Sequence, residues 1–299
     1  MVRCLLPVAL VALVATSASA KPRWQTLPLP PAMPKAVTTG QVSVGDASIY
    51  YATYGSPGKG TVVLLHGGLG NSDHWAFQLP VLADKFQVIV IDSRGHGRST
   101  LSKDTKLTYR VMANDVIEVL DHLEIDRASF VGWSDGGVIA LDLAIQKPDR
   151  VNKLFVFGAN YDSSGGKPRK GTTATFTAYA AKCRADYRRI AKEPKAYGVL
   201  LDSLTPLWRS QGGFSKEQMR GIAARATVAI GDHDELIRRD HVEEMAKLIP
   251  EAELVVFKNA SHFALWQDPK TFNQALLKLL AEAGTDSSGG RRSSTPAGE

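Results

Sequence analysis

The residue best suited to nucleophilic chemistry is Ser134, the centre of the run Gly-Trp-Ser-Asp-Gly at residues 132–136. An apolar stretch at residues 128–131 precedes this run, and apolar residues with helical spacing follow it. The pattern predicts a strand, a sharp turn and a helix, with the serine at the turn. Glycines flank the turn because the two backbones pass too close together for a Cβ atom. A serine held in this way can attack a carbonyl carbon.

A serine hydroxyl is a weak nucleophile at neutral pH, so it needs a base, and the base needs a group that orients it. Two stretches further along the chain supply such groups. The acidic run at residues 232–235 follows an apolar stretch at 226–230, and His262 follows another at 253–257. Both lie just past a predicted strand, so we expect them at the same sheet edge as Ser134.

The rest of the chain supplies elements that could position these groups. Strands are predicted at residues 41–44, 47–54, 61–65, 86–91, 128–133, 151–157, 226–230 and 253–257. Helices are predicted at 74–83, 109–123, from the serine turn to Lys147, at 240–248 and at 269–283. This alternation predicts an α/β fold with a mostly parallel sheet covered by helices on both faces. Residues 161–220 contain no clear apolar strand, and we expect them to form a small helical cap over the carboxyl edge of the sheet.

The two ends of the chain differ from the predicted domain at residues 40–283. Residues 1–20 carry Arg3, an apolar run and a small-x-small site, which predicts a signal peptide cleaved after Ala20 and export to the periplasm or medium. Residues 21–39 are proline-rich and predict an extended leader. Residues 284–299 are rich in Gly, Ser and Arg, and predict a disordered tail.

Composition limits the function further. The 299 residues carry a net charge of +6, with a basic segment at residues 167–195 that we interpret as a solvated surface. No nucleic-acid-binding motif accompanies the charge, and the mature chain has no predicted membrane span. Cys183 is the only cysteine outside the predicted signal peptide, and no Cys-rich or His-rich cluster suggests a metal. We therefore expect no nucleic-acid partner and no metal ion.

These motifs resemble those of serine hydrolases of the α/β-hydrolase superfamily, over nearly all of residues 40–283. The supporting stretches are residues 66–68, 92–99, 132–137, 231–234 and 261–262. The order serine, acid, histidine along the chain is also that of the superfamily. The resemblance implies an α/β-hydrolase fold with an eight-stranded sheet and a cap inserted after strand 6. Within the superfamily, the chain is most similar to small-cap esterases of the biphenyl hydrolase-like type.

The resemblance also implies roles for single residues. It favours Asp234 as the acid over Asp232 and Glu235, and it makes Ser134 and His262 the nucleophile and base of an acyl-enzyme mechanism that needs no cofactor. The oxyanion-hole donors would be the N–H groups of the residues Asp135 and Gly68, or Leu69 in place of Gly68. The residues expected to bind substrate are Trp133, Asp135 and Leu69.

The sequence also gives expectations for the places of the other histidines and for the class of substrate. His66 is expected to brace the oxyanion loop, and His96 to be structural; the histidines expected at the surface are His74, His122, His233 and His241. The favoured substrate is a small carboxylic ester, including an amino-acid ester bound through Asp135, or a lactone. Carbon–carbon bond hydrolysis, cofactor-free perhydrolysis and removal of residues from short peptides remain alternatives, as does a non-catalytic binding protein.

Overall fold

The structure, a computed structural model, describes residues 20–282 except 59, 102–104, 169–171 and 210–212. The predicted tail and all of the predicted signal peptide except Ala20 therefore lie outside the described residues.

The described chain is built on one sheet of eight strands in the order β1-β2-β4-β3-β5-β6-β7-β8. The strands are β1 Thr38–Val44, β2 Ala47–Tyr54, β3 Thr61–Leu65, β4 Gln87–Ile91, β5 Ala128–Trp133, β6 Val151–Phe157, β7 Arg225–Gly231 and β8 Ala252–Phe257. β2 is antiparallel to both β1 and β4, and the pairs from β4 to β8 are parallel. This confirms the mostly parallel sheet predicted from the apolar runs.

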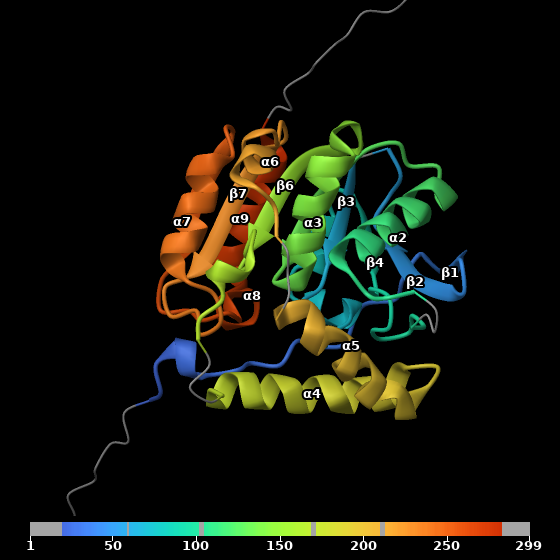
Figure 1. The fold of residues 1–299 in the computed structure, drawn as a ribbon. Coiled ribbons are helices and arrows are strands. Elements are labelled where there is room, and N and C mark those ends of the chain that lie inside the picture. Colours follow the sequence, from blue (N-terminus) through green and yellow to red (C-terminus); the bar gives the residue numbers. More distant parts are fainter. Residues whose placement is uncertain (1–19, 59, 102–104, 169–171, 210–212, 283–299) are drawn as a thin grey trace, which may run out of the picture.

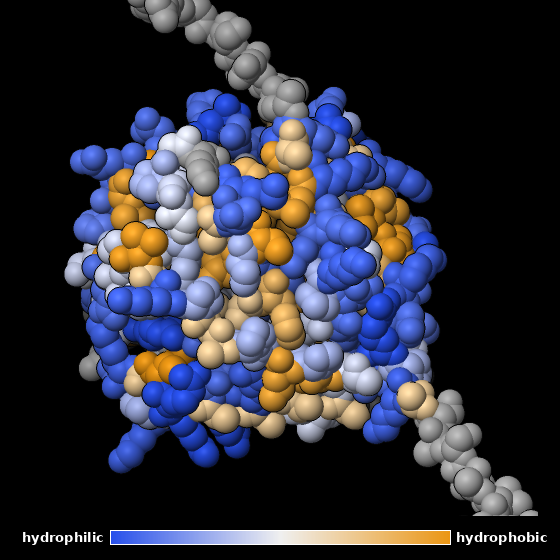
Figure 2. Space-filling view, turned by 180° about the vertical axis from the view of Figure 1, so that it is seen from behind, coloured by the Kyte–Doolittle hydropathy of each residue, from blue (hydrophilic) through white to orange (hydrophobic). Residues whose placement is uncertain are grey.

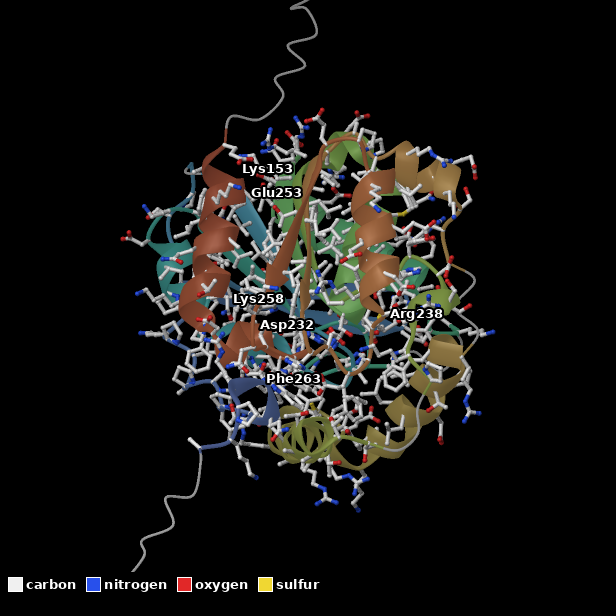
Figure 3. The ribbon with its side chains drawn as sticks, turned by 90° about the vertical axis from the view of Figure 1, so that its left-hand side faces the viewer. Lys153, Asp232, Arg238, Glu253, Lys258 and Phe263 are labelled. Atoms are coloured by element: carbon white, nitrogen blue, oxygen red, sulfur yellow. The ribbon has the colours of Figure 1, made fainter. Side chains whose placement is uncertain are left out.

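Helices cover both faces of the sheet. They are α1 Leu79–Ala83, α2 Tyr109–His122, α3 Asp135–Gln146, α7 Arg239–Leu248, α8 Ala264–Gln267 and α9 Pro269–Ala281. Figure 1 shows α2, α3 and α7 in front of the sheet and α9 behind it, and Figure 3 shows α7 and α9 on opposite sides of the strands. The central strands β3 and β5 are therefore buried on both faces, as expected for a sheet of continuous apolar runs.

The predicted helix at residues 74–83 is wrong in its extent. A short 3₁₀ helix spans Ser72–Trp75, and the side chain of Asn71 caps it. The helix α1 begins separately at Leu79, with Pro80 in its first turn, a position where proline's missing N–H costs nothing. His74 lies in this 3₁₀ helix, and its side chain is fully buried.

The cap lies between β6 and β7. It contains α4 Ala174–Ile190, α5 Tyr197–Arg209 and α6 Lys216–Arg220. Figure 1 shows α4 running across the end of the sheet where the strands leave for the loops, with α5 between it and the sheet. The helix α4 is polar overall, but it buries one narrow face made of Tyr179, Cys183, Asp186 and Tyr187.

The proline-rich leader is not simply extended. Arg23–Gln25 form a 3₁₀ turn, and the Trp24 ring stacks on His233 at 4.5 Å between ring centroids. The Nε2 group of Gln267 donates hydrogen bonds to the carbonyl oxygens of Trp24 and Thr26. The leader is thus fixed to the end of the sheet that carries the loops after β7 and β8.

The outer surface shows no single dominant apolar area from behind. Figure 2 shows hydrophobic residues in several separate groups among hydrophilic ones on that face. Among the described helices, none is both long and apolar enough to cross a membrane.

Candidate active site

Ser134 lies at the turn between β5 and α3, with backbone angles φ 54° and ψ −119°. A non-glycine residue with positive φ is strained, and such strain is common where a side chain must be presented for chemistry. The turn is tight on both sides. A Cβ atom on Gly132 would lie 2.3 Å from the Gly136 carbonyl oxygen, and one on Gly136 would lie 2.0 Å from the Leu65 carbonyl oxygen. Glycine is therefore required at both positions.

The loops after β7 and β8 bring Asp234 to His262. The distance between Asp234 Oδ2 and His262 Nδ1 is 2.8 Å, and both side chains are buried. Asp234 Oδ1 accepts hydrogen bonds from the N–H groups of Leu236 and Ile237, each at 2.9 Å, which fixes the carboxylate. Burial lowers the pKa of His262, but the charge and hydrogen bond of Asp234 outweigh it and raise that pKa above its ordinary value.

The other two acids of the run 232–235 have different partners. Asp232 Oδ1 accepts a hydrogen bond from the N–H of Ala260 at 3.2 Å. Glu235 Oε2 accepts one from the main-chain N–H of His262 at 3.0 Å. In this arrangement Asp234 is the acid that reaches the imidazole, while Asp232 and Glu235 hold the loop that carries it. Figure 3 shows Asp232 and Lys258 near the ends of β7 and β8, with Phe263 beyond them toward the cap.

Trp133, which precedes the serine, is fully buried. Its Nε1 donates a hydrogen bond to the carbonyl oxygen of His262 at 2.9 Å. Its side chain borders the pocket beside Ser134, but its one polar group is directed to the histidine loop. The indole thus fixes the distance between the serine turn and the histidine turn.

The loop after β3, residues 67–70, passes directly beside the serine. A Cβ atom on Gly67 would lie 3.2 Å from the Cβ of Ser134. The N–H of Gly70 donates to the carbonyl oxygen of Gly67 at 3.0 Å, which closes a tight turn. The N–H of Asp135, at the first position of α3, has no partner within its own helix. The loop and the helix start therefore offer main-chain donors close to Ser134.

His66 supports this loop through a hydrogen bond from each side of its ring. Its Nε2 accepts from the N–H of Ser93 at 3.0 Å, so its Nδ1 carries the proton and donates to the Gly67 carbonyl oxygen at 2.8 Å. Burial, together with the nearby His96, lowers the pKa of His66 to about 3, so the ring is neutral. A neutral ring with one donor and one acceptor satisfies both neighbours.

Comparison with known proteins agrees with the fold described above. Residues 60–182 match the alpha/beta hydrolase fold family. The uncharacterized hydrolase YugF of Bacillus subtilis is 35% identical over 134 residues, or 45% of this chain and 48% of YugF, so the match spans about half the length of that relative. The putative carbamate hydrolase RutD of Agrobacterium fabrum is 26% identical over 243 residues, or 74% of this chain and 93% of RutD. The eight-stranded, mostly parallel sheet with helices on both faces has the α/β-hydrolase fold, in agreement with these matches.

Solved structures of the superfamily share the fold. The structure described as Est816, an N-acyl homoserine lactone degrading enzyme, has a TM-score of 0.63 and 28% identity, covering 80% of this chain and 99% of its own. The enol-lactonase from Burkholderia xenovorans LB400 has a TM-score of 0.65 at 24% identity, covering 81% of this chain and 100% of its own, which shows the fold alone. The family match and the hydrolases among the relatives together show that the protein is a hydrolase.

The hydrolase has a pocket of about 580 Å³ between its sheet edge and its cap. Ser134 and His262 border it, and so do the aromatic side chains of Tyr109, Phe176, Tyr179 and Trp208. The pocket is large enough for a small ester, and its walls combine these aromatic rings with polar groups that include Lys167 and Arg209.

Asp135 projects into this pocket and is held by two uncharged donors. The Tyr109 hydroxyl donates to its Oδ1 and the Trp208 Nε1 to its Oδ2, both at 2.9 Å. Burial raises the pKa of Asp135, and these two hydrogen bonds lower it only in part. Neither Tyr109 nor Trp208 is singled out by the sequence pattern, because their common partner is distant along the chain.

Two histidines expected at the surface are buried in the hydrolase, which corrects that expectation. His74 contacts Asp186 of α4 at 3.3 Å between Nε2 and Oδ2. The ring of His241 stacks on Tyr161 at 4.1 Å between centroids. Burial lowers the pKa of both histidines. Among the described residues, no group of three or more His, Cys, Asp or Glu side chains could hold a metal ion.

Proposed function

We propose that this hydrolase cleaves small carboxylic esters through an acyl-enzyme formed on Ser134. The observation that carries the proposal is the arrangement of a strained serine turn and a buried His262–Asp234 pair around one pocket. A serine, a base and an acid that orients the base form the constellation that acyl transfer requires.

The proposed reaction has two halves. In the first, His262 takes the proton of Ser134 as the oxygen attacks the ester carbonyl carbon, and then gives that proton to the leaving alcohol. In the second, His262 takes a proton from water, whose oxygen attacks the acyl-enzyme, and returns it to the serine oxygen as the acid leaves. Asp234 fixes the Nδ1–H tautomer and stabilises the imidazolium that forms in each half.

The oxyanion of each tetrahedral intermediate needs two preorganised donors. The N–H groups of Asp135 and Gly68 are the donors we propose, since the loop 67–70 lies beside Ser134 and Asp135 begins α3. Glycine at position 68 suits this role because a Cβ there would come within 2.4 Å of the Asp135 carboxylate.

Asp135 supports an amino-acid ester as one substrate class. Its hydrogen-bond donors, Tyr109 and Trp208, are both uncharged, so a substrate ammonium group would bring a positive charge to a carboxylate that lacks one. A lactone is the second candidate, and the 28% identity to the lactone-degrading Est816 favours it.

The first test is hydrolysis of an ester panel by the purified protein and by Ser134→Ala. The panel contains p-nitrophenyl butyrate, an α-amino-acid ester and an acyl homoserine lactone. Turnover by the wild type should fall by about a thousandfold or more in the variant. Equal rates in the two proteins would contradict the proposed nucleophile.

The second test asks what Asp135 binds. Asp135→Asn should lower kcat/KM for the amino-acid ester by at least about tenfold more than for p-nitrophenyl butyrate, because only the first carries an ammonium group. The butyrate ester is thus the internal control for any general disturbance of the pocket. An equal loss on both esters would remove the amino-acid ester from the proposal.

We also propose that the hydrolase is exported, on the basis of the predicted signal peptide at residues 1–20. N-terminal sequencing of the protein from the periplasm or medium should begin at Lys21. An intact Met1 terminus on cytoplasmic protein would contradict export.

A further inference from the structure

The cap helix α4 reaches into the catalytic loops through one buried side chain. The hydroxyl of Tyr179 donates a hydrogen bond to the carbonyl oxygen of Gly68 at 2.8 Å. We propose that Tyr179 is a positioning residue, which holds the loop 67–70 in the orientation that the oxyanion requires and so makes the chemical step depend on the seating of α4. This inference rests on the function proposed above.

The shape of the loop shows why it needs such support. The hydrogen bond from Gly70 N–H to the Gly67 carbonyl oxygen closes a four-residue turn with Gly68 and Leu69 at its centre. Leu69 has φ 66°, whereas Gly68 does not have positive φ. A positive φ at the third residue alone is the mark of a type II turn, which normally has glycine there. Leucine in that conformation is strained.

A type I turn would relieve this strain, and it differs from type II by rotation of the central peptide group. That peptide group carries the Gly68 carbonyl oxygen and the Leu69 N–H. Its rotation would move the carbonyl oxygen away from the Tyr179 hydroxyl, so the hydrogen bond from α4 stabilises the strained form. Only the strained form has the geometry described above for the loop beside Ser134.

The two peptide groups on either side of Gly68 are therefore held separately. The preceding group is fixed through the Gly67 carbonyl oxygen, which accepts from Gly70 N–H and from His66 Nδ1. The following group is fixed by Tyr179. The Gly68 N–H belongs to the first group. The Leu69 N–H, the alternative oxyanion donor, belongs to the second, so the hydrogen bond from Tyr179 fixes its direction.

Tyr179 is well placed to act as a rigid support. Its side chain is buried, and its ring packs against those of Trp133, Phe263 and Trp266 with centroids 5.4, 5.1 and 5.8 Å away. The hydroxyl would also lie 3.0 Å from a Cβ on Gly70, so it contacts the loop on both sides of Leu69. An aromatic ring packed in this way cannot follow the loop if the loop moves.

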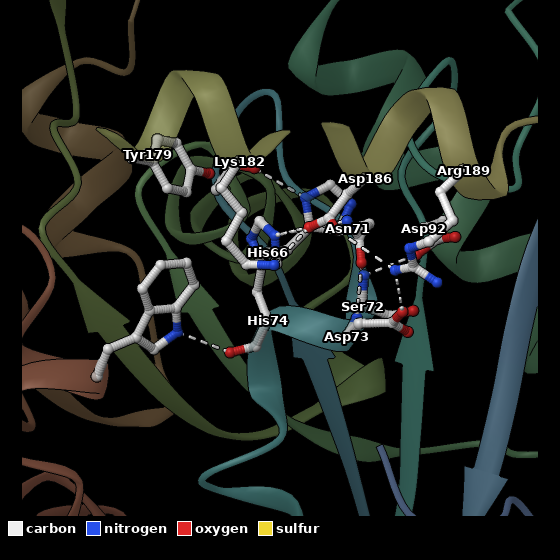
Figure 4. A network of polar contacts seen from close by, with 12 residues as sticks. His66, Asn71, Ser72, Asp73, His74, Asp92, Tyr179, Lys182, Asp186 and Arg189 are labelled. Atoms are coloured by element: carbon white, nitrogen blue, oxygen red, sulfur yellow. Dashed lines mark hydrogen bonds and ion pairs between the residues drawn. The ribbon is translucent and has the colours of Figure 1, made fainter. Parts of the chain in front are cut away.

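Contacts on either side of Tyr179 fix α4 itself. Near its start, the Thr175 hydroxyl donates to Glu235 Oε1 at 2.7 Å. Near its end, Asp186 contacts His74, and Lys182 Nζ donates to the same Asp186 oxygen at 2.8 Å. Figure 4 shows this group of Lys182, Asp186 and His74 beside Tyr179. Part of the basic segment thus faces inward and secures the cap.

The direct test is Tyr179→Phe, with Tyr187→Phe as the matched control. Tyr187 is a buried tyrosine of the same helix whose ring packs on Tyr197 rather than on the loop 67–70. Because an oxyanion donor acts in the transition state, Tyr179→Phe should lower kcat by about ten- to a hundredfold with KM changed by less than about twofold. Tyr187→Phe should leave kcat within about twofold of the wild type.

Leu69→Gly separates positioning of the turn from a merely structural role. Glycine has no penalty for positive φ, so the type II form should persist without the hydroxyl. The loss of kcat caused by Tyr179→Phe should then shrink to less than about threefold in the Leu69→Gly background. An equal loss in both backgrounds, or no loss in the wild-type background, would overturn the inference.

Fluorophosphonate labelling distinguishes a failure of the role proposed for Tyr179 from a failure of the proposed serine mechanism. Labelling of the wild type at Ser134 should proceed, and it should be slower in Tyr179→Phe in proportion to kcat. A wild type that is not labelled would contradict the serine mechanism itself. A wild type and a Tyr179→Phe variant labelled at equal rates would contradict only the role of Tyr179.

Discussion

The serine turn and the cap hold the same pocket from opposite sides, but they are specified in different ways. The turn is specified locally, by two glycines within residues 132–136 whose backbones leave no room for a side chain. The cap is specified by contacts between residues more than a hundred positions apart, such as Tyr179 with Gly68 and Asp186 with His74. The nucleophile is thus fixed by sterics, whereas its oxyanion loop depends on side chains inserted from elsewhere.

This difference predicts how each region fails. A steric requirement is all-or-none, because an overlap of backbone atoms has no low-energy alternative. A hydrogen bond from a distant helix can be removed while the fold persists, at a modest cost in stability or rate. Substitutions at the turn should therefore abolish activity, whereas substitutions at the cap should change stability or rate by modest amounts.

The largest effect should come from Asp234→Asn, which leaves the shape of the site intact but removes the charge that orients His262. Without the carboxylate, the imidazole loses its preferred tautomer and its stabilised cation, and kcat should fall by about 10⁴-fold. Asp232→Asn is the control, because the Asp232 carboxylate contacts the Ala260 N–H and the His233 ring rather than the His262 ring. Comparable losses from both variants would contradict the assignment of the acid.

Gly136→Ala should be next in size. The added Cβ would lie 2.0 Å from the Leu65 carbonyl oxygen, so the free energy of unfolding should drop by about 4 kcal/mol or more, or folding should fail. The control is Gly198→Ala in α5, where a Cβ meets nothing within 4 Å and should raise stability by about 0.5 kcal/mol. Urea denaturation measures both, and a stable, active Gly136→Ala would refute the steric account.

Asp186→Asn should weaken the attachment of the cap. Burial raises the pKa of Asp186, but hydrogen bonds from His74 and Lys182 outweigh it and lower that pKa, so the group is an anion. Losing that charge should cost about 1–3 kcal/mol of unfolding free energy. Glu217→Gln on the exposed surface of α6 should have no measurable effect. Unchanged stability and KM in Asp186→Asn would mean that the cap does not depend on this contact.

The smallest effect concerns pH. The reaction needs neutral His262, whose pKa is raised above 6.5, so kcat/KM should rise with pH through a midpoint above that value. Glu235 contributes to the raised pKa, so Glu235→Gln should move the midpoint to lower pH, while Glu253→Gln on exposed β8 should not. A midpoint that shifts upward in Glu235→Gln would contradict the electrostatic account.

The sequence predicts the fold well because the strands are short apolar runs bounded by polar loops. The strands at 61–65 and 151–157 have the predicted limits, β8 begins one residue earlier than predicted, and β7 is one residue longer than predicted at each end. The same regularity indicates which loops share an edge, and the structure brings Ser134, Asp234 and His262 to that edge.

What the sequence does not predict depends on distant partners. His74 resembles a surface residue of a polar segment, and only the arrival of α4 buries it against Asp186. Trp208 and Tyr109 show no pattern that indicates Asp135 as their acceptor. Composition describes the cap as polar and helical, but the few inward-facing residues that give it a fixed position are visible only in three dimensions.

The buried Cys183 has a practical consequence. Its thiol faces inward one turn from Tyr179, and burial raises its pKa, so a thiol reagent cannot attack it while α4 is in place. In a chain that begins at Lys21 it is the sole thiol, since the other cysteine is Cys4. The rate at which a thiol reagent modifies Cys183 in such a chain therefore reports how often the cap opens. No engineered label is needed.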